Sequence, residues 1–188
     1  MFECRSLSIA DIEFIYKNYM VNDFPKDELK PLSMIKKSIS KSQYECFGIY
    51  SNDELCGYAF FVCLDKLCLL DYLAILSDRR GTGIGSEFID LLKNEMSKFD
   101  IVICEADNPD YSNGKELEIR QKRVSFYFRN GFADTTVTTN VFGAEFKLLE
   151  LNMGKIHSRD EVIEAYSSLY KSFLPPAVYK KVFHIHEQ

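Results

Sequence analysis

Residues 80–85 read Arg80-Gly81-Thr82-Gly83-Ile84-Gly85, and this glycine-rich turn decides how the rest of the chain is interpreted. The turn follows an apolar run at 67–76 that predicts a strand covered on both faces. It precedes an amphipathic helix whose predicted buried face carries Phe88, Leu91, Leu92 and Met96. A short apolar run at 101–104 predicts the next strand, so residues 67–104 form a strand–turn–helix–strand unit.

A glycine-rich turn between a strand and a helix is a ready site for an anion. The unpaired N–H groups of the first helical turn point out of the helix end, and the helix dipole adds partial positive charge there. Glycines let the backbone approach a bulky pyrophosphate, because no Cβ stands in the way. Arg80 adds a full charge and a planar set of donors. The turn therefore predicts a ligand that carries phosphate.

Two common phosphate-binding motifs fit this turn poorly. A P-loop requires Lys and then Ser or Thr after its last glycine, whereas Gly85 is followed by Ser86 and Glu87. A dinucleotide fingerprint reads G-x-G-x-x-G, and this chain is one residue short of it. Glu105, at the end of the next predicted strand, stands about where a ribose-binding acid would, so a dinucleotide-binding protein remains the third interpretation.

The elements on either side of this unit predict a mixed α/β (α+β) fold. Ser8 and Asp11 form a candidate capping box for a helix that runs to about Met20, after a first strand at 2–7. The pattern further predicts a helix after Pro31, hairpin strands at 44–50, 55–64 and 67–76, a helix at 119–130, strands at 133–141 and 145–151, a capped helix from Ser158 to about Phe173, and a short tail after Pro175-Pro176.

Composition limits the class of protein. The chain has 188 residues, of which 46% are hydrophobic and 27% charged, as in an ordinary single globular domain. A net charge of −5 without a basic stripe argues against a nucleic-acid partner. No apolar stretch approaches the roughly 20 residues that span a bilayer. The six cysteines have no C-x-x-C spacing, so we expect buried thiols in a reduced, cytoplasmic protein without a metal site.

Three segments together resemble one known family. Arg80-Gly81-Thr82-Gly83-Ile84-Gly85 resembles the Q/R-x-x-G-x-G coenzyme A loop of the GNAT superfamily of acetyl-CoA-dependent N-acetyltransferases. Leu73-Ala74-Ile75 looks like the fourth strand of that family, and residues 126–132 resemble its later F-Y-x-x-x-G-F helix end. The resemblance covers residues 1–151, the expected GNAT domain with its mostly antiparallel central sheet flanked by helices. Residues 152–188 are expected to form a C-terminal helical extension packed on the same domain.

The resemblance implies direct transfer of an acetyl group from acetyl-CoA to a primary amine within a ternary complex. It implies that the backbone of the fourth strand pairs with the pantetheine arm and that an amide near Ile75 stabilises the oxyanion. The residues expected to bind the coenzyme are Leu73, Ala74, Ile75, Arg80, Gly81, Thr82, Gly83, Ile84, Gly85 and Ser86.

Proton transfer needs further residues. Tyr127 matches the tyrosine that commonly serves as the acid in this family, although aromatic residues at helical spacing also form cores. For the base, related histone-acetylating enzymes place a Glu where this chain has Leu69. Asp71 lies two residues further along the same strand face, and Glu105 ends the neighbouring strand. Both remain candidates for the base, and both also fit ordinary carboxylates at strand ends.

A second interpretation is a GNAT fold that binds an acyl-CoA for regulation without catalysis, because the acid at Leu69 is absent. The sequence does not identify the acceptor, which could be a small-molecule amine or a protein amine, and it leaves a homodimer open. We expect neither a nucleic acid nor a membrane as partner.

Overall fold

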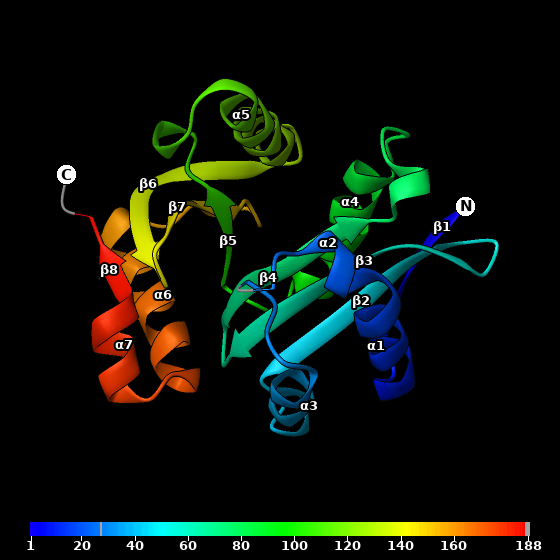
Figure 1. The fold of residues 1–188 in the computed structure, drawn as a ribbon, viewed down its shortest axis with the longest axis horizontal. Helices are drawn as coiled ribbons and strands as arrows, with labels where there is room; N and C mark the ends of the chain where they lie inside the picture. The colour runs from blue at the N-terminus through cyan, green and yellow to red at the C-terminus, as the bar shows by residue number, and fades with distance from the viewer. Residues whose placement is uncertain (27, 187–188) are drawn as a thin grey trace. The chain divides into compact units, whose positions relative to one another are not determined.

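A computed structural model describes residues 1–26 and 28–186 of the chain. The chain forms two compact units. The first unit comprises residues 1–63 and 70–95, and the second comprises residues 64–69 and 96–188. Figure 1 shows the elements of each unit along the colour gradient of the chain.

The first unit is built on strands that follow one another along the chain. They are β1 (Phe2–Ser6), β2 (Tyr44–Ser51), β3 (Glu54–Leu64) and β4 (Leu67–Ile75), and they lie side by side in that order. β1 pairs with β2, and β2 with β3, in antiparallel register. Asn52 and Asp53 connect β2 to β3 with φ of 50° and 62°, the backbone of a tight hairpin turn. The predicted hairpin is confirmed.

The helices of the first unit begin where the sequence predicts. α1 (Ile9–Ile15) opens with the full Ser8–Asp11 capping box. The predicted single helix to Met20 is interrupted by a π-helical turn (Tyr16–Met20), which leads into the short α2 (Val21–Asp23). α3 (Leu32–Ser40) follows Pro31 and buries Ile35. α4 (Ile84–Met96) follows the glycine-rich turn.

Gly57 of β3 allows the close approach of β4. A Cβ added at Gly57 would lie 2.6 Å from the carbonyl oxygen of Ala74 and 2.7 Å from Cδ1 of Ile75. The next residue along, Leu76, donates its backbone N–H to the carbonyl of Cys56 at 2.9 Å. The glycine therefore helps to fix the end of β4 that leads into the glycine-rich turn.

Gly57→Ala is expected to lower the free energy of unfolding by about 1–3 kcal/mol, because the new methyl group meets a backbone carbonyl that cannot rotate away. Urea unfolding of the variant and the wild type measures the change in this free energy. Gly48→Ala is the matched control, since the three atoms nearest to its added Cβ belong to the side chains of Leu7, Tyr50 and Leu55, at 2.8–3.0 Å. An equal loss of stability in the two variants would contradict the role given to Gly57.

The second unit contains an antiparallel sheet with the strand order β5-β7-β6-β8. Its strands are β5 (Ile101–Asp107), β6 (Phe132–Val141), β7 (Ala144–Leu151) and β8 (Phe183–Ile185), and its helices are α5 (Gly114–Arg129), α6 (Arg159–Phe173) and α7 (Pro176–Val182). α5 and α6 lie on opposite sides of these strands (Figure 1). α6 opens with the predicted capping box of Ser158 and Glu161.

The largest departures from the predicted element bounds lie in the second unit. β5 extends three residues beyond Cys104, to Asp107. α5 begins at Gly114 rather than 119, because its first turn is polar and shows no apolar period. The segment predicted as a tail forms α7 and β8, and Phe183 of β8 is buried against the rings of Tyr166 and Tyr170.

All six cysteines are free thiols, and all except the half-buried Cys4 are buried, as predicted for small apolar residues. Burial, and next the charge of Glu95, raise the pKa of Cys4 to about 12. Burial also raises the pKa of Cys104 to about 12 and that of Cys46 well above its usual range. These thiols are therefore protonated at neutral pH.

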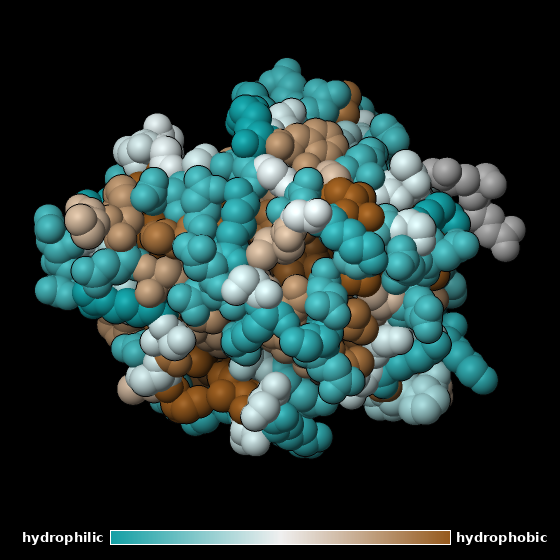
Figure 2. Space-filling model, turned by 180° about the vertical axis from the view of Figure 1, so that it is seen from behind, coloured by the Kyte–Doolittle hydropathy of each residue, from teal (hydrophilic) through white to brown (hydrophobic). Residues whose placement is uncertain are grey.

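Within residues 1–26 and 28–186, every helix is too short or too polar to cross a membrane. Figure 2 shows one face of the molecule, on which hydrophilic and hydrophobic residues are interspersed.

Candidate active site

The glycine-rich turn links β4 to α4 by way of a short 3₁₀ turn (Ser77–Arg79). Gly81 and Gly83 adopt φ of 77° and 87°, which residues with a side chain rarely adopt. An added Cβ at either glycine would find no atom within 4 Å. The two glycines are therefore required by backbone conformation, and the space beside them is open.

Hydrogen bonds close the turn onto the start of α4. The carbonyl of Gly83 accepts the backbone N–H groups of Ser86 at 3.0 Å and Glu87 at 3.2 Å. The Thr82 hydroxyl donates to the carbonyl of Arg79 at 2.7 Å. Gly81, Thr82 and Gly83 are exposed. Of the residues predicted to bind the coenzyme, Ser86 thus has its amide occupied within the turn, which leaves its hydroxyl as the candidate contact.

Arg80 is anchored beside this turn. Its Nε donates to the carbonyl of Ile75 at 2.8 Å, and its Nη2 donates to Asp23 at 2.8 Å. The other carboxylate oxygen of Asp23 accepts the Tyr58 hydroxyl at 2.7 Å. The Arg80 side chain is 55% exposed, whereas that of Asp23 is 16% exposed. The guanidinium is thus held at the end of β4 and remains open to solvent.

The structure brings the end of β4 and the glycine-rich turn into contact. Ala74 is buried, while Leu73 and Ile75 are half-buried. The bond from Arg80 to the Ile75 carbonyl joins the two segments predicted to hold the coenzyme.

Asp71, a candidate base on β4, binds a cation and a tyrosine. Its Oδ1 lies 2.5 Å from Nζ of Lys30, and its Oδ2 accepts the hydroxyl of Tyr44. Burial, and next the charge of Asp71, raise the pKa of Tyr44 well above its ordinary value. The Tyr44 hydroxyl therefore stays protonated and serves as a donor to Asp71.

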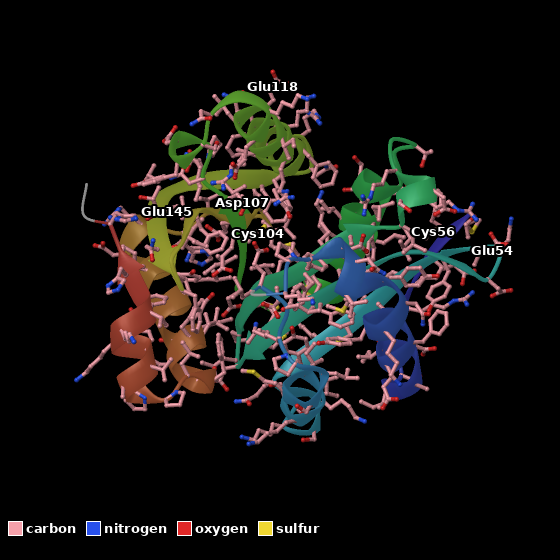
Figure 3. All side chains as sticks on the ribbon, viewed as in Figure 1. Glu54, Cys56, Cys104, Asp107, Glu118 and Glu145 are labelled. Carbon is pink, nitrogen blue, oxygen red and sulfur yellow. The ribbon has the colours of Figure 1, made fainter. Side chains whose placement is uncertain are left out.

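Tyr127, the candidate acid on α5, is only 7% exposed. Its hydroxyl interacts with the thiol of Cys104 on β5. Burial, and next the neighbouring Cys104, raise the pKa of Tyr127 well above its ordinary value. One turn before Tyr127, Arg123 forms an ion pair with Asp107. Figure 3 labels Cys104 and Asp107 on β5.

Glu105, the second candidate base, faces the other side of β5. Its Oε1 accepts the hydroxyls of Tyr166 and Tyr170 of α6, the latter at 2.6 Å. Successive strand residues point to opposite faces, so Cys104 contacts α5 and Glu105 contacts α6. The structure therefore does not bring Glu105 and Tyr127 together on one face of β5.

Sequence reasoning missed the partners of these residues: Asp23, Lys30, Tyr44, Tyr58 and Cys104. The first four residues are far from their partners in the sequence, and no local sequence pattern predicts contacts between distant residues. Cys104 could have been found from strand alternation, which places it on the face opposite Glu105. Among the described residues, no group of three or more His, Cys, Asp or Glu side chains could hold a metal ion.

Comparison with known proteins agrees with this arrangement. The model of the "Acetyltransferase (GNAT) family" matches residues 9–112, more than half of the chain. The chain is 24% identical over 153 residues to the Bacillus subtilis protein "Putative acetyltransferase YjbC", covering 79% of this chain and 76% of that protein.

Solved structures show the same fold. One, described as a "Putative acetyltransferase from GNAT family", comes from Bacteroides thetaiotaomicron, with a TM-score of 0.70 and 16% identity, covering 91% of this chain and 98% of that one. Another is the ribosomal-protein-S18-alanine N-acetyltransferase of Escherichia coli, with a TM-score of 0.60 and 18% identity. The match covers 84% of this chain and 97% of that one.

The chain belongs to the GNAT acetyltransferase family. It is therefore an acyltransferase with acetyl-CoA as its co-substrate, and its fold is the predicted mixed α/β fold with mostly antiparallel strands.

Proposed function

We propose that this protein transfers an acetyl group from acetyl-CoA to a primary amine by direct attack in a ternary complex. The observation that carries the proposal is the exposed turn of Gly81, Thr82 and Gly83 with Arg80 anchored to the Ile75 carbonyl beside it. Backbone amides at the start of a helix and a guanidinium together match a pyrophosphate.

Donor binding would use two neighbouring segments. The residues of the turn and Arg80 would take the pyrophosphate, and the backbone of Leu73, Ala74 and Ile75 would pair with the pantetheine arm as an added strand would. An amide near Ile75 would stabilise the oxyanion. Two solved GNAT structures with similar folds support this choice of donor: a Bacillus subtilis acetyltransferase in complex with CoA, and an Elizabethkingia anophelis enzyme with acetyl-CoA bound.

The reaction forms a bond between the amine nitrogen and the acetyl carbon, and it breaks the bond between that carbon and the coenzyme sulfur. The amine must lose a proton, and the leaving thiolate must be stabilised or protonated. Tyr127 is assigned the second task, because its hydroxyl is protonated at neutral pH and can donate to the leaving thiolate. The same hydroxyl already interacts with the sulfur of Cys104.

Of the two candidate bases, Asp71 fits an amine better. It already binds one alkylammonium group, that of Lys30, whereas Glu105 accepts two tyrosine hydroxyls. We assign the role of receiving the acceptor amine to Asp71. The acceptor itself is a small-molecule or protein amine; fold relatives include a chimera of spermidine N-acetyltransferase and the enzyme for ribosomal protein S18.

A non-catalytic acyl-CoA-binding module is the alternative. The engagement of both Asp71 and Glu105 by other side chains favours it, since neither carboxylate is set to take a proton without rearrangement. Transfer of an acetyl group to any member of a broad panel of amines would favour the enzyme over the non-catalytic module.

Acetyl-CoA at 1 mM is expected to raise the Tm by roughly 5–10 °C. At this concentration a ligand with a Kd of about 10 μM is present at about 100 times its Kd and stabilises the native state by about 2.7 kcal/mol. Differential scanning fluorimetry measures the shift, and its absence would contradict the proposed function.

Arg80→Ala should reduce affinity about 10- to 100-fold, the effect of losing a charged hydrogen-bonding partner. Arg79→Ala is the matched control. Arg79 precedes Arg80 but pairs with Glu54 and Asp78, and its loss should change affinity less than about threefold. Equal effects of the two substitutions would mean that Arg80 has no special role.

A further inference from the structure

The ammonium group of Lys30 lies beside a carboxylate and aromatic rings, the kinds of group that bind an alkylammonium ion. Its Nζ lies 2.5 Å from Oδ1 of Asp71, 6.0 Å from the ring centroid of Tyr44 and 5.9 Å from that of Tyr72. The ring of Phe24 packs edge-on against Tyr72 at 4.8 Å and extends the aromatic wall. A carboxylate combined with aromatic rings within about 6 Å is the chemistry that recognises organic ammonium groups.

The site is largely shielded from solvent. The Lys30 side chain is 22% exposed and that of Asp71 is 10% exposed. The Tyr44 hydroxyl donates to the second oxygen of Asp71, so the carboxylate is held in place from one side and presents its other oxygen to the cation. Shielding strengthens the attraction between the charges.

Backbone hydrogen bonds hold the segment around Lys30 in place. Lys30 lies between α2 and α3, where its backbone N–H donates to the Tyr72 hydroxyl at 2.8 Å and its carbonyl accepts the Tyr16 hydroxyl at 3.1 Å. The Tyr72 hydroxyl also donates to the carbonyl of Glu28 at 2.9 Å. Because these bonds involve only the backbone of the segment, they would persist with another residue at position 30.

A shielded ion pair contributes little net stability, because removing both charges from water costs free energy. Apolar residues of similar size often stabilise a fold equally well. Asp71 lies on β4, the strand that ends in Leu73-Ala74-Ile75, to which we assign the pantetheine arm. Residues 28–31 lie in no helix or strand, and a stretch held by a few hydrogen bonds opens more readily than the elements beside it.

We propose that Asp71, Tyr44 and Tyr72 form the binding site for the acceptor's ammonium group, and that Lys30 occupies this site until an acceptor displaces it. The acceptor class is then an unbranched primary alkylamine that is cationic at neutral pH, free or as the side chain of a lysine. This inference rests on the proposed function and names the acceptor for it.

The test uses Lys30→Ala and the probe n-propylammonium, which replaces the atoms lost beyond Cβ. The full-length variant should bind n-propylammonium at least about tenfold more tightly than the wild-type protein, as measured by isothermal titration calorimetry without acetyl-CoA. Lys36→Ala is the matched control, because it removes an exposed ion pair of 2.6 Å with Glu13 and should bind the probe no better than wild type. The double variant Lys30→Ala with Asp71→Asn should lose the gain.

If the unpaired Asp71 destabilises Lys30→Ala, the same probe should restore its Tm, whereas n-propanol should not. A second variant, Lys30→Gln, removes the charge, keeps most of the length of the side chain and should lower KM for a linear alkylamine at unchanged KM for acetyl-CoA. Equal affinity of Lys30→Ala and Lys36→Ala for n-propylammonium, or rescue by n-propanol as well, would overturn the inference and leave Lys30 as a structural ion pair. The acetyl-CoA melting shift, measured on the same samples, reports separately whether the proposed function holds.

Discussion

Replacing Gly83 with aspartate is expected to abolish measurable acetyl-CoA binding while the protein stays folded. Gly83 has φ of 87°, and no atom lies within 4 Å of an added Cβ, so the new side chain points into open space rather than into the core. A residue with a side chain at such a backbone angle costs of order 1–2 kcal/mol. The carboxylate would stand at the exposed turn to which we assign the pyrophosphate, and two anions repel each other there. Titration calorimetry measures the loss.

The hairpin between β6 and β7 provides a matched control for this substitution. Gly143 has φ of 88° and equally open space around an added Cβ. Gly143→Asp therefore introduces the same charge with the same backbone strain at a position without an assigned ligand. We expect it to lose a similar amount of stability and to keep its affinity for acetyl-CoA. Unchanged affinity in Gly83→Asp would show that the phosphates bind elsewhere.

Tyr127→Phe is expected to lower kcat by roughly 10²- to 10⁴-fold, the range attributed to one general acid, while acetyl-CoA affinity barely changes. The substitution removes one oxygen from a side chain that packs edge-on against Phe126 and Phe132, so packing is kept. A loss confined to kcat, with KM intact, marks an interaction made mainly in the transition state. The raised pKa of Tyr127 also predicts that ionisation of this hydroxyl causes no decline in wild-type kcat between pH 7 and 9. Steady-state kinetics on an acceptor found by an amine screen provide the measurement.

Tyr50→Phe is the control, because it removes a tyrosine hydroxyl from β2 at a half-buried position. Its kcat should equal that of the wild type. Equal kcat for Tyr127→Phe and wild type would remove Tyr127 from the mechanism and favour the non-catalytic binding module.

Local patterns were enough to predict most of the fold. The capping boxes at Ser8 and Ser158 lie within four consecutive residues each, and both were found in the sequence and confirmed. The Asn52-Asp53 turn and the glycine-rich turn can likewise be recognised from a few consecutive residues. β8 was not predicted, because its three residues, Phe183–Ile185, are too few to show the alternation of apolar and polar residues typical of a strand. They form a strand by pairing with β6.

The chemistry of the candidate site was less predictable. The motif predicted Arg80 and Tyr127, yet nothing in the sequence indicates that Arg80 binds Asp23, 57 positions away, or that Lys30 binds Asp71, 41 positions away. Such pairs depend on how β4 lies beside the segments before it. Glu105 shows the limit of reasoning by position. The strand was predicted but extends further, to Asp107, and no local pattern indicates that the Glu105 side chain binds Tyr166 and Tyr170.

The protonated cysteines have a consequence for a protein that handles a thioester. A thiolate attacks a thioester readily, whereas a thiol does so poorly. With pKa values of about 12, Cys4 and Cys104 are ionised in only about one molecule in 10⁴–10⁵ at neutral pH. Burial thus suppresses exchange of the acetyl group onto these side chains, which would consume acetyl-CoA and acylate the protein. At these two positions, burial thus keeps the acetyl group for the proposed amine acceptor.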